Sequence, residues 1–201
     1  MSTVTTYPNG QVLTSTALTK DTATALLQLM TCGMIGVNPP DFSRVRVDWP
    51  TEGQSVADTP QQDVCFISAV PNDTDYSRIR DRVRTGSRPG PLVYTWQYTR
   101  GWRFSWVAYG PNSTDNLRAV RSALFQDYFN DLLSAANLYP LSDPPEVIRV
   151  PEQFNAEWWE RADYHVDLYE NVTETIIVGA VSSVPINVEA KEITVSTVVT
   201  A

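Results

Sequence analysis

The chain has little of what most enzyme active sites are built from. It contains a single histidine, His165, and its two cysteines, Cys32 and Cys65, show no metal-ligand spacing. Acyl-transfer chemistry needs a histidine oriented beside a nucleophile, and no Gly-x-Ser-x-Gly elbow is present. The only glycine-rich loop, residues 86–90, has no Lys-Ser/Thr pair, and its proline removes an amide donor that a phosphate would need. We therefore expect no enzyme activity, no cofactor and no metal site.

Long apolar runs and lysine are also scarce. No segment approaches the roughly 20 apolar residues of a membrane span, and no signal-peptide pattern opens the chain, so we expect no membrane association. Two cysteines in apolar surroundings are most simply buried free thiols, which suits assembly in a reducing cytoplasm. Thirteen of the fifteen basic residues are arginine, whose planar guanidinium favours bidentate pairing with carboxylates.

The net charge of −8 comes entirely from the last third of the chain. Residues 1–142 contain twelve basic and twelve acidic residues, whereas residues 143–201 contain eleven acidic residues and three basic ones. A two-sided charge distribution of this kind can support contacts between unlike surfaces of neighbouring subunits. It disfavours tight binding of nucleic acid by the domain as a whole.

The clearest structural pattern runs from residue 92 to residue 138. Apolar and aromatic residues alternate over residues 92–98 and again over 102–108, which predicts two half-buried strands, and Arg100-Gly101 predicts a hairpin turn between them. After Gly110-Pro111 the apolar spacing changes to 3.6, which predicts one long helix capped by Ser113 or Asp115. The helix has one apolar stripe, formed by Leu117, Val120, Leu124, Phe125, Tyr128, Phe129 and Leu132. We assign the aromatics of the hairpin to the core and to a subunit interface rather than to base stacking.

Shorter patterns flank this segment. The first fifteen or so residues are polar and predict an arm or a loose lead-in, after which Thr19 or Asp21 opens a helix. An alternating strand is expected around residues 45–49, and a strand buried on both faces over residues 63–70. Residues 161–168 and 176–188 alternate again and predict two strands joined by a turn near Asn171.

The most unusual local feature is a row of arginines. They alternate with Ile79, Asp81 and Val83, so an extended chain would place them on one side; they are Arg78, Arg80, Arg82 and Arg84, with Arg88 following. The segment is either a solvated arm or one that docks on an acidic neighbour or on phosphate. We favour a neighbouring subunit, because the acidic last third includes Asp163 and Asp167 on the polar side of a predicted strand. These seven arginine and aspartate residues are the predicted interface.

Two segments resemble the bacteriophage neck and tail-terminator proteins. Residues 102–124, WRFSWVAYGPNSTDNLRAVRSAL, resemble that family's strand, aromatic-Tyr-Gly-x-Asn turn and long helix. Residues 151–176, PEQFNAEWWERADYHVDLYENVTETI, resemble its Trp-x-x-Arg-Ala-x-hydrophobic strand, carried here by Trp158, Arg161 and Ala162. With the intervening elements, the resemblance covers roughly residues 19–188. The Arg-bearing arm and the Val/Thr-rich tail lie outside it.

The resemblance implies an α+β fold: a mixed, mostly antiparallel β-sheet with two main helices packed on it. The residue patterns outside the resemblance add an extended arm and a terminal tail. The expected division is an N-terminal arm over residues 1–18, a tail-terminator-like domain over 19–188 and a tail over 189–201. A projecting arm would occupy about residues 72–91 of the domain.

The resemblance further implies a structural virion protein of the phage neck, assembled in the host cytoplasm. Six copies would form a homo-oligomeric ring that ends the tail tube and meets the head-completion or connector protein. Genomic DNA would pass through its lumen without specific binding. Two other interpretations remain open at this point: a different head–tail connector or adaptor, and a non-viral protein-binding module. Connector adaptors are mainly helical, so a high strand content would disfavour the first.

Overall fold

The computed structural model describes residues 3–178, except 9–10, 49–59, 87–90, 141–142 and 155. Within these residues the helices are α1 (Lys20–Met34), α2 (Ser113–Ala123) and α3 (Asp127–Ala135), with a single 3₁₀ turn, η1 (Asp75–Arg78). The strands are β1 (Thr3–Thr6), β2 (Val12–Ser15), β3 (Val45–Val47), β4 (Val64–Asn72), β5 (Asp81–Thr85), β6 (Leu92–Tyr109), β7 (Leu138–Pro140), β8 (Ile148–Arg149), β9 (Glu152–Phe154), β10 (Glu157–Trp159) and β11 (Arg161–Val178).

One large sheet organises the molecule. Its main order is β1-β2-β11-β6-β4-β3, with β5 added to β6, and β7 and β8 added to β11. Only the β3–β4 pairing is parallel among the described strands, and β9 and β10 form a separate small hairpin. The expected α+β class and the mixed, mostly antiparallel sheet are therefore confirmed. The described residues contain three helices rather than two main ones.

The turns predicted at Arg100-Gly101 and near Asn171 are wrong, because β6 and β11 are each a continuous strand of 18 residues. Residues 179–188 of the last predicted strand and the predicted tail over residues 189–201 lie outside the described residues. The strands β6 and β11 pair antiparallel over their whole length, from Arg161 opposite Tyr109 to Val178 opposite Leu92. The apolar alternation keeps the same phase from residue 92 to residue 108, which is the pattern of an uninterrupted strand. Gly101 serves a close approach rather than a turn: a Cβ there would lie 2.6 Å from the carbonyl oxygen of Asn72.

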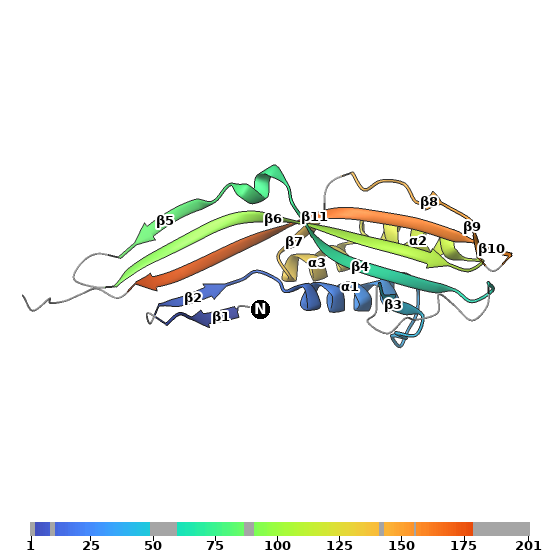
Figure 1. The fold of residues 1–201 in the computed structure, drawn as a ribbon, viewed down its shortest axis with the longest axis horizontal. Coiled ribbons are helices and arrows are strands. Elements are labelled where there is room, and N and C mark those ends of the chain that lie inside the picture. Colours follow the sequence, from blue (N-terminus) through green and yellow to red (C-terminus); the bar gives the residue numbers. More distant parts are fainter. Residues whose placement is uncertain are drawn as a thin grey trace, which may run out of the picture.

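The long strands divide the molecule into two parts, which we call the body and the arm (Figure 1). In the body, all three helices lie against the half of the sheet formed by residues 101–109 of β6 and 161–170 of β11, with β3 and β4. The arm consists of residues 92–100 of β6, residues 171–178 of β11, and β1, β2 and β5. The polar lead-in is thus not loose: β1 and β2 form a hairpin that pairs with β11.

The core lies between the helices and the body half of the sheet. Trp102, Phe104 and Trp106 of β6 are each no more than 2% exposed. They pack in one cluster with the apolar side of α1, which begins at Thr19 as predicted: its hydroxyl accepts a hydrogen bond from the backbone N–H of Thr22. Cys32 and Cys65 are buried free thiols, as expected, and burial raises the pKa of Cys65 to about 12.

The single long helix predicted after Gly110-Pro111 is wrong, because the chain forms α2 and α3 with a break at residues 124–126. Gln126 has an extended backbone (φ −88°, ψ 137°), and α3 then takes a new direction that buries Phe129 and Leu133. Core packing therefore overrides the helical spacing. As a result, Phe125 and Tyr128, expected on the apolar stripe, are exposed.

Candidate interaction surface

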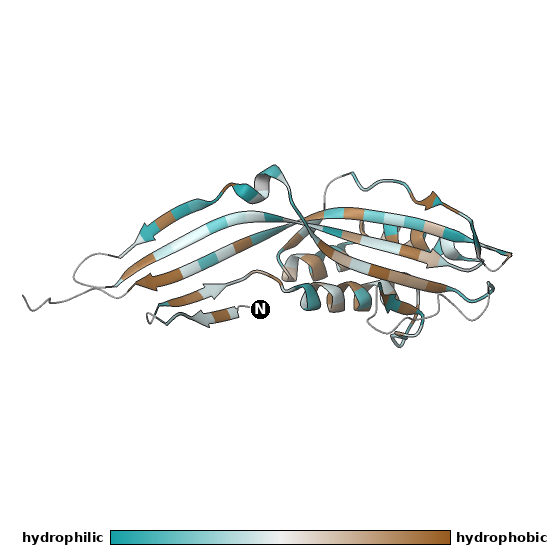
Figure 2. Ribbon diagram, in the orientation of Figure 1, coloured by the Kyte–Doolittle hydropathy of each residue, from teal (hydrophilic) through white to brown (hydrophobic). Residues whose placement is uncertain are grey.

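The arm presents an aromatic sheet face that no described helix covers. Strand register aligns Arg84, Tyr94, Ile176 and Leu13 in one cross-strand row, and Arg82, Trp96 and Glu174 in the next. Tyr94, Trp96 and Tyr98 of β6 are only partly buried, although aromatic side chains of this size usually contribute to a core or an interface. Figure 2 shows the contrast within the arm between mostly hydrophilic β5 and the apolar residues along β2 and the end of β11.

Two of the predicted arginines lie over these aromatic rings. The Arg80 guanidinium is 4.2 Å from the centre of the Tyr98 ring, and that of Arg82 is 4.3 Å from the centre of the Tyr94 ring. Arg80 is also 3.5 Å from the Glu174 carboxylate. Stacking occupies the face of a guanidinium and leaves N–H groups in its plane able to bind a carboxylate. The rings therefore hold the cations in position for a partner.

The other arginines of the row differ from one another. Arg78 lies in η1 and pairs with Asp73 at 2.7 Å, so it is not part of the stacked row. Arg84 is exposed on β5 and has no carboxylate partner among the described residues. Arg88 falls outside the part of the chain that the structure describes. The arginines that lie side by side on the arm are therefore Arg80, Arg82 and Arg84.

The predicted acidic residues are already paired within this chain. Arg103 makes a bidentate pair with Asp167, at 2.8 and 2.9 Å, and Arg161 does the same with Asp163, at 2.7 and 2.9 Å. Most of the described acidic third is neutralised in this way, through Arg149–Glu160, Arg161–Glu152, Arg100–Glu170 and Arg80–Glu174. The regional charge imbalance in the sequence thus does not correspond to a free acidic surface at these positions.

The Arg103–Asp167 pair should make stability fall with acidification. The hydrogen bond from Arg103 lowers the pKa of the Asp167 carboxyl from its ordinary value, so this group stabilises the fold at neutral pH and the contribution is lost as pH falls through the folded-state pKa. We expect the thermal midpoint of Asp167→Asn to lie below wild type at pH 7 and to approach it once the pH falls below the lowered pKa of Asp167. Asp143→Asn changes the same charge at an exposed position. If the two variants show the same pH profile, the pair contributes nothing measurable.

A buried carboxylate joins the arm to the body. Glu170 is fully buried, and its oxygens accept hydrogen bonds from the backbone N–H of Leu18 at 2.6 Å, Arg100 Nε at 2.7 Å and Trp102 Nε1 at 2.6 Å. The cluster ties the N-terminal hairpin to the middle of β6 and β11. This ion pair was not predicted from the sequence, although a signal was present. Arg100 and Glu170 both stand where the alternation of their strands calls for an apolar residue, and an isolated charge is costly there.

The two sequence motifs behind the family resemblance contact each other at the far end of the body. Gly110 donates its N–H to the carbonyl oxygen of Glu160 at 3.1 Å, and the rings of Tyr109 and Trp159 meet edge to face with centroids 6.4 Å apart. The Tyr109 hydroxyl donates to Glu152 at 2.9 Å, and burial together with this bond raises the pKa of Tyr109 to about 12. These motif residues therefore build the fold rather than a site for chemistry.

The N-terminus of α2 is also held by this corner. Neither Ser113 nor Asp115 caps the helix as predicted; the cap residue is Asn112, whose side chain makes no capping hydrogen bond. Asp63 accepts instead from the backbone N–H of Asn112 at 3.0 Å and from its side-chain amide at 2.8 Å. A carboxylate at a helix N-terminus is favoured by the helix dipole, so Asp63 fixes α2 against the start of β4.

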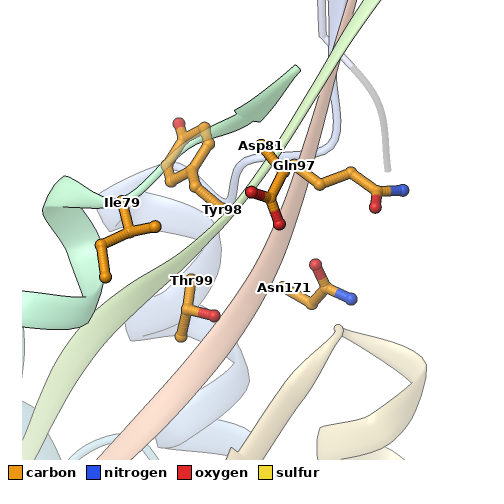
Figure 3. A pocket seen from close by; sticks show the side chains of 6 residues that line it. All are labelled: Ile79, Asp81, Gln97, Tyr98, Thr99 and Asn171. Atoms are coloured by element: carbon orange, nitrogen blue, oxygen red, sulfur yellow. The ribbon is translucent and has the colours of Figure 1, made fainter. Parts of the chain in front are cut away.

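Features that would support chemistry are weak in the described part of the chain. A shallow hollow of about 280 Å³ lies where β5, β6 and β11 meet, lined by Ile79, Asp81, Gln97, Tyr98, Thr99 and Asn171 (Figure 3). It offers one carboxylate. His165 is exposed between the two arginine-bound aspartates. Over these same residues there is no cluster of three potential metal ligands, and none of the helices is long and apolar enough to cross a membrane.

Comparison with known protein families identifies the same family as the two motifs. The sequence matches the phage neck terminator protein family over residues 21–195, which include both long strands, α2, α3 and all but the first residue of α1. A search of curated proteins found no match. Because the family match covers most of the chain, the chain belongs to the phage neck terminator protein family.

Proposed function

We propose that this neck protein forms a ring, with six copies as the expected number, that ends the tail tube and joins it to the head. The observation that carries the proposal is the arm: a sheet that extends away from α1, α2 and α3 of the body. Burial of an uncovered aromatic sheet face by another protein is favourable, so such a face is typical of a protein–protein interface. Contacts between unlike surfaces close into rings when the rotation between copies allows it.

The ring would surround the genomic DNA without binding it specifically. Tight DNA binding requires free cations against the phosphates, whereas most described arginines pair with carboxylates of the same chain. The partners are the tail tube protein on one side and the head-completion or connector protein on the other. The protein would act as a structural component of the virion, assembled in the host cytoplasm, without catalysis.

Within the ring, the arm arginines would contact an adjacent subunit or a neighbouring ring rather than DNA. This proposal covers Arg80, Arg82 and Arg84, and extends to Arg78 and Arg88 of the predicted interface. Asp163 and Asp167 remain proposed interface residues. To bind them, a partner would have to compete with Arg161 and Arg103. The free chain would be a monomer or a loose oligomer that closes into a stable ring on its partners.

The proposal is tested by removing the gene from the parent phage. We expect infected cells to accumulate DNA-filled heads and separate tails, and purified protein added to such an extract to restore joined, infectious particles. Electron microscopy of the lysate and the plaque titre provide the two measurements. Normal joined particles in the absence of the protein would contradict a role in the neck junction.

A further inference from the structure

The corner between α2 and α3 carries an acidic, aromatic surface that the chain does not cover. Phe125 is 58% exposed and Tyr128 is 66% exposed. Asp127 and Asp131 are exposed on the first two turns of α3, where the sequence contains no lysine or arginine. Neither aspartate has an ion-pair partner among the described residues. We call these four residues the α3 patch.

The arm supplies the complementary chemistry. Arg82 lies over the rings of Tyr94 and Trp96. Neither Arg82 nor Arg84 beside it has a carboxylate partner among the residues described. One cation held over aromatic rings and a second exposed cation beside it thus match two carboxylates flanked by exposed rings. Aromatic and arginine side chains are the types that dominate binding energy at interfaces. The acidity of the α3 patch also argues against phosphate as its partner.

The same molecule cannot bring its own arm onto its own α3 patch. The strands β6 and β11 run unbroken from body to arm and are hydrogen-bonded along their whole length. At about 3.3 Å per residue, the nine residues of β6 in the arm extend on the order of 30 Å from the body. A fold-back would break this ladder and the Glu170 cluster at its centre. An arm and an α3 patch that contact each other therefore belong to two different copies.

We infer that the arm of one copy docks on the α3 patch of the next, with Arg82 and Arg84 facing Asp127 and Asp131. The inference rests on the proposed ring and names its subunit contact. In the proposed ring, each copy uses its arm on one neighbour and its α3 patch on the other. This head-to-tail contact closes into a ring when the rotation between copies allows it, whereas a reciprocal exchange of arms would give a two-fold dimer.

Charge reversal in the gene-deleted parent phage, supplied with variants in trans, tests the contact. Arg82→Glu/Arg84→Glu and Asp127→Arg/Asp131→Arg should each lower the plaque titre by roughly 100-fold or more, since like charges then meet at the interface. The four-residue variant carrying both changes should recover to within about 10-fold of wild type, because each reversed arm again meets a complementary patch. Lys20→Glu reverses an exposed charge of α1 and should leave the titre unchanged.

Circular dichroism of each purified variant separates misfolding from lost contact. If a double variant does not fold, Arg84→Glu and Asp131→Arg replace it, because neither side chain has an ion-pair partner among the described residues. A wild-type titre for the folded arm or patch variants overturns the inference, as does a folded four-residue variant that shows no recovery. Failure of wild-type protein to restore joining would instead overturn the proposed function.

Discussion

Replacing Glu170 by alanine is expected to lower the free energy of unfolding by about 3–5 kcal/mol, the usual cost of removing one partner of a buried ion pair. Glu170 is fully buried and binds Arg100, the indole N–H of Trp102 and the backbone N–H of Leu18. Alanine would leave the N–H groups of Trp102 and Leu18 without an acceptor in the centre of the molecule, and Arg100 would keep only its bond to the Leu18 carbonyl oxygen. At about 2–4 °C per kcal/mol for a chain of this size, the thermal midpoint should fall by roughly 10 °C.

The matched control is Glu160→Ala, which removes an exposed carboxylate that binds Arg149 from a neighbouring segment. Exposed pairs usually contribute about 0–1 kcal/mol, so this variant should stay close to wild type in thermal unfolding followed by circular dichroism. Glu170→Gln keeps the shape and loses the charge, and should fall between the two. Equal midpoints for Glu170→Ala and Glu160→Ala would show that the buried cluster does not hold arm and body together.

Gly110→Ala is expected to cost about 3 kcal/mol or more in unfolding free energy. Gly110 has a φ of +106°, and an added Cβ would lie 2.5 Å from Asp63 Oδ1 and 2.7 Å from the carbonyl oxygen of Gln62. The left-handed backbone alone costs a residue with a Cβ about 1–2 kcal/mol. The collision adds to this cost. To make room for the Cβ, the Asp63 carboxylate must move and release Asn112 at the start of α2.

Gly36→Ala separates backbone strain from collision. Gly36 also has a positive φ, +74°, but an added Cβ there would meet nothing within 4 Å. The unfolding free energy of Gly36→Ala, measured by urea denaturation, should therefore drop only by the backbone strain of about 1–2 kcal/mol. If Gly36→Ala and Gly110→Ala lose the same stability, the close packing of Asp63 against the turn is not what constrains Gly110.

Strand patterning could be predicted from the sequence, but strand continuity was misjudged. Alternation correctly placed Ala162, Tyr164, Val166 and Leu168 toward the core, and all four are buried. Gly101 suggested a turn because glycine often marks one, whereas here it allows β4 to approach β6. A continuous phase of alternation was the stronger signal. The break between α2 and α3 had no comparable signal, because it follows from packing of Phe129 and Leu133 against other elements.

The candidate surface shows the same limit of sequence patterns. The arginine row was visible in the sequence, and its extended strand β5 follows from the alternation. Its stacking on Tyr94 and Tyr98 depends on β5 pairing with β6, a contact that no local pattern specifies. The regional charge count pointed to the last third, where most of the described acidic residues prove to be paired. The unpaired carboxylates of α3 lie in the balanced part of the chain, and only the three-dimensional pairing reveals them.

The most direct test of this account is a cryo-electron microscopy reconstruction of the head–tail junction in the parent particle. We predict a ring of this protein between the tail tube and the head connector, with the arm of each copy on the α3 patch of the next and Arg82 close to Asp127 or Asp131. A reconstruction with the arm arginines lining the lumen against DNA, or with the protein absent from the junction, would contradict it.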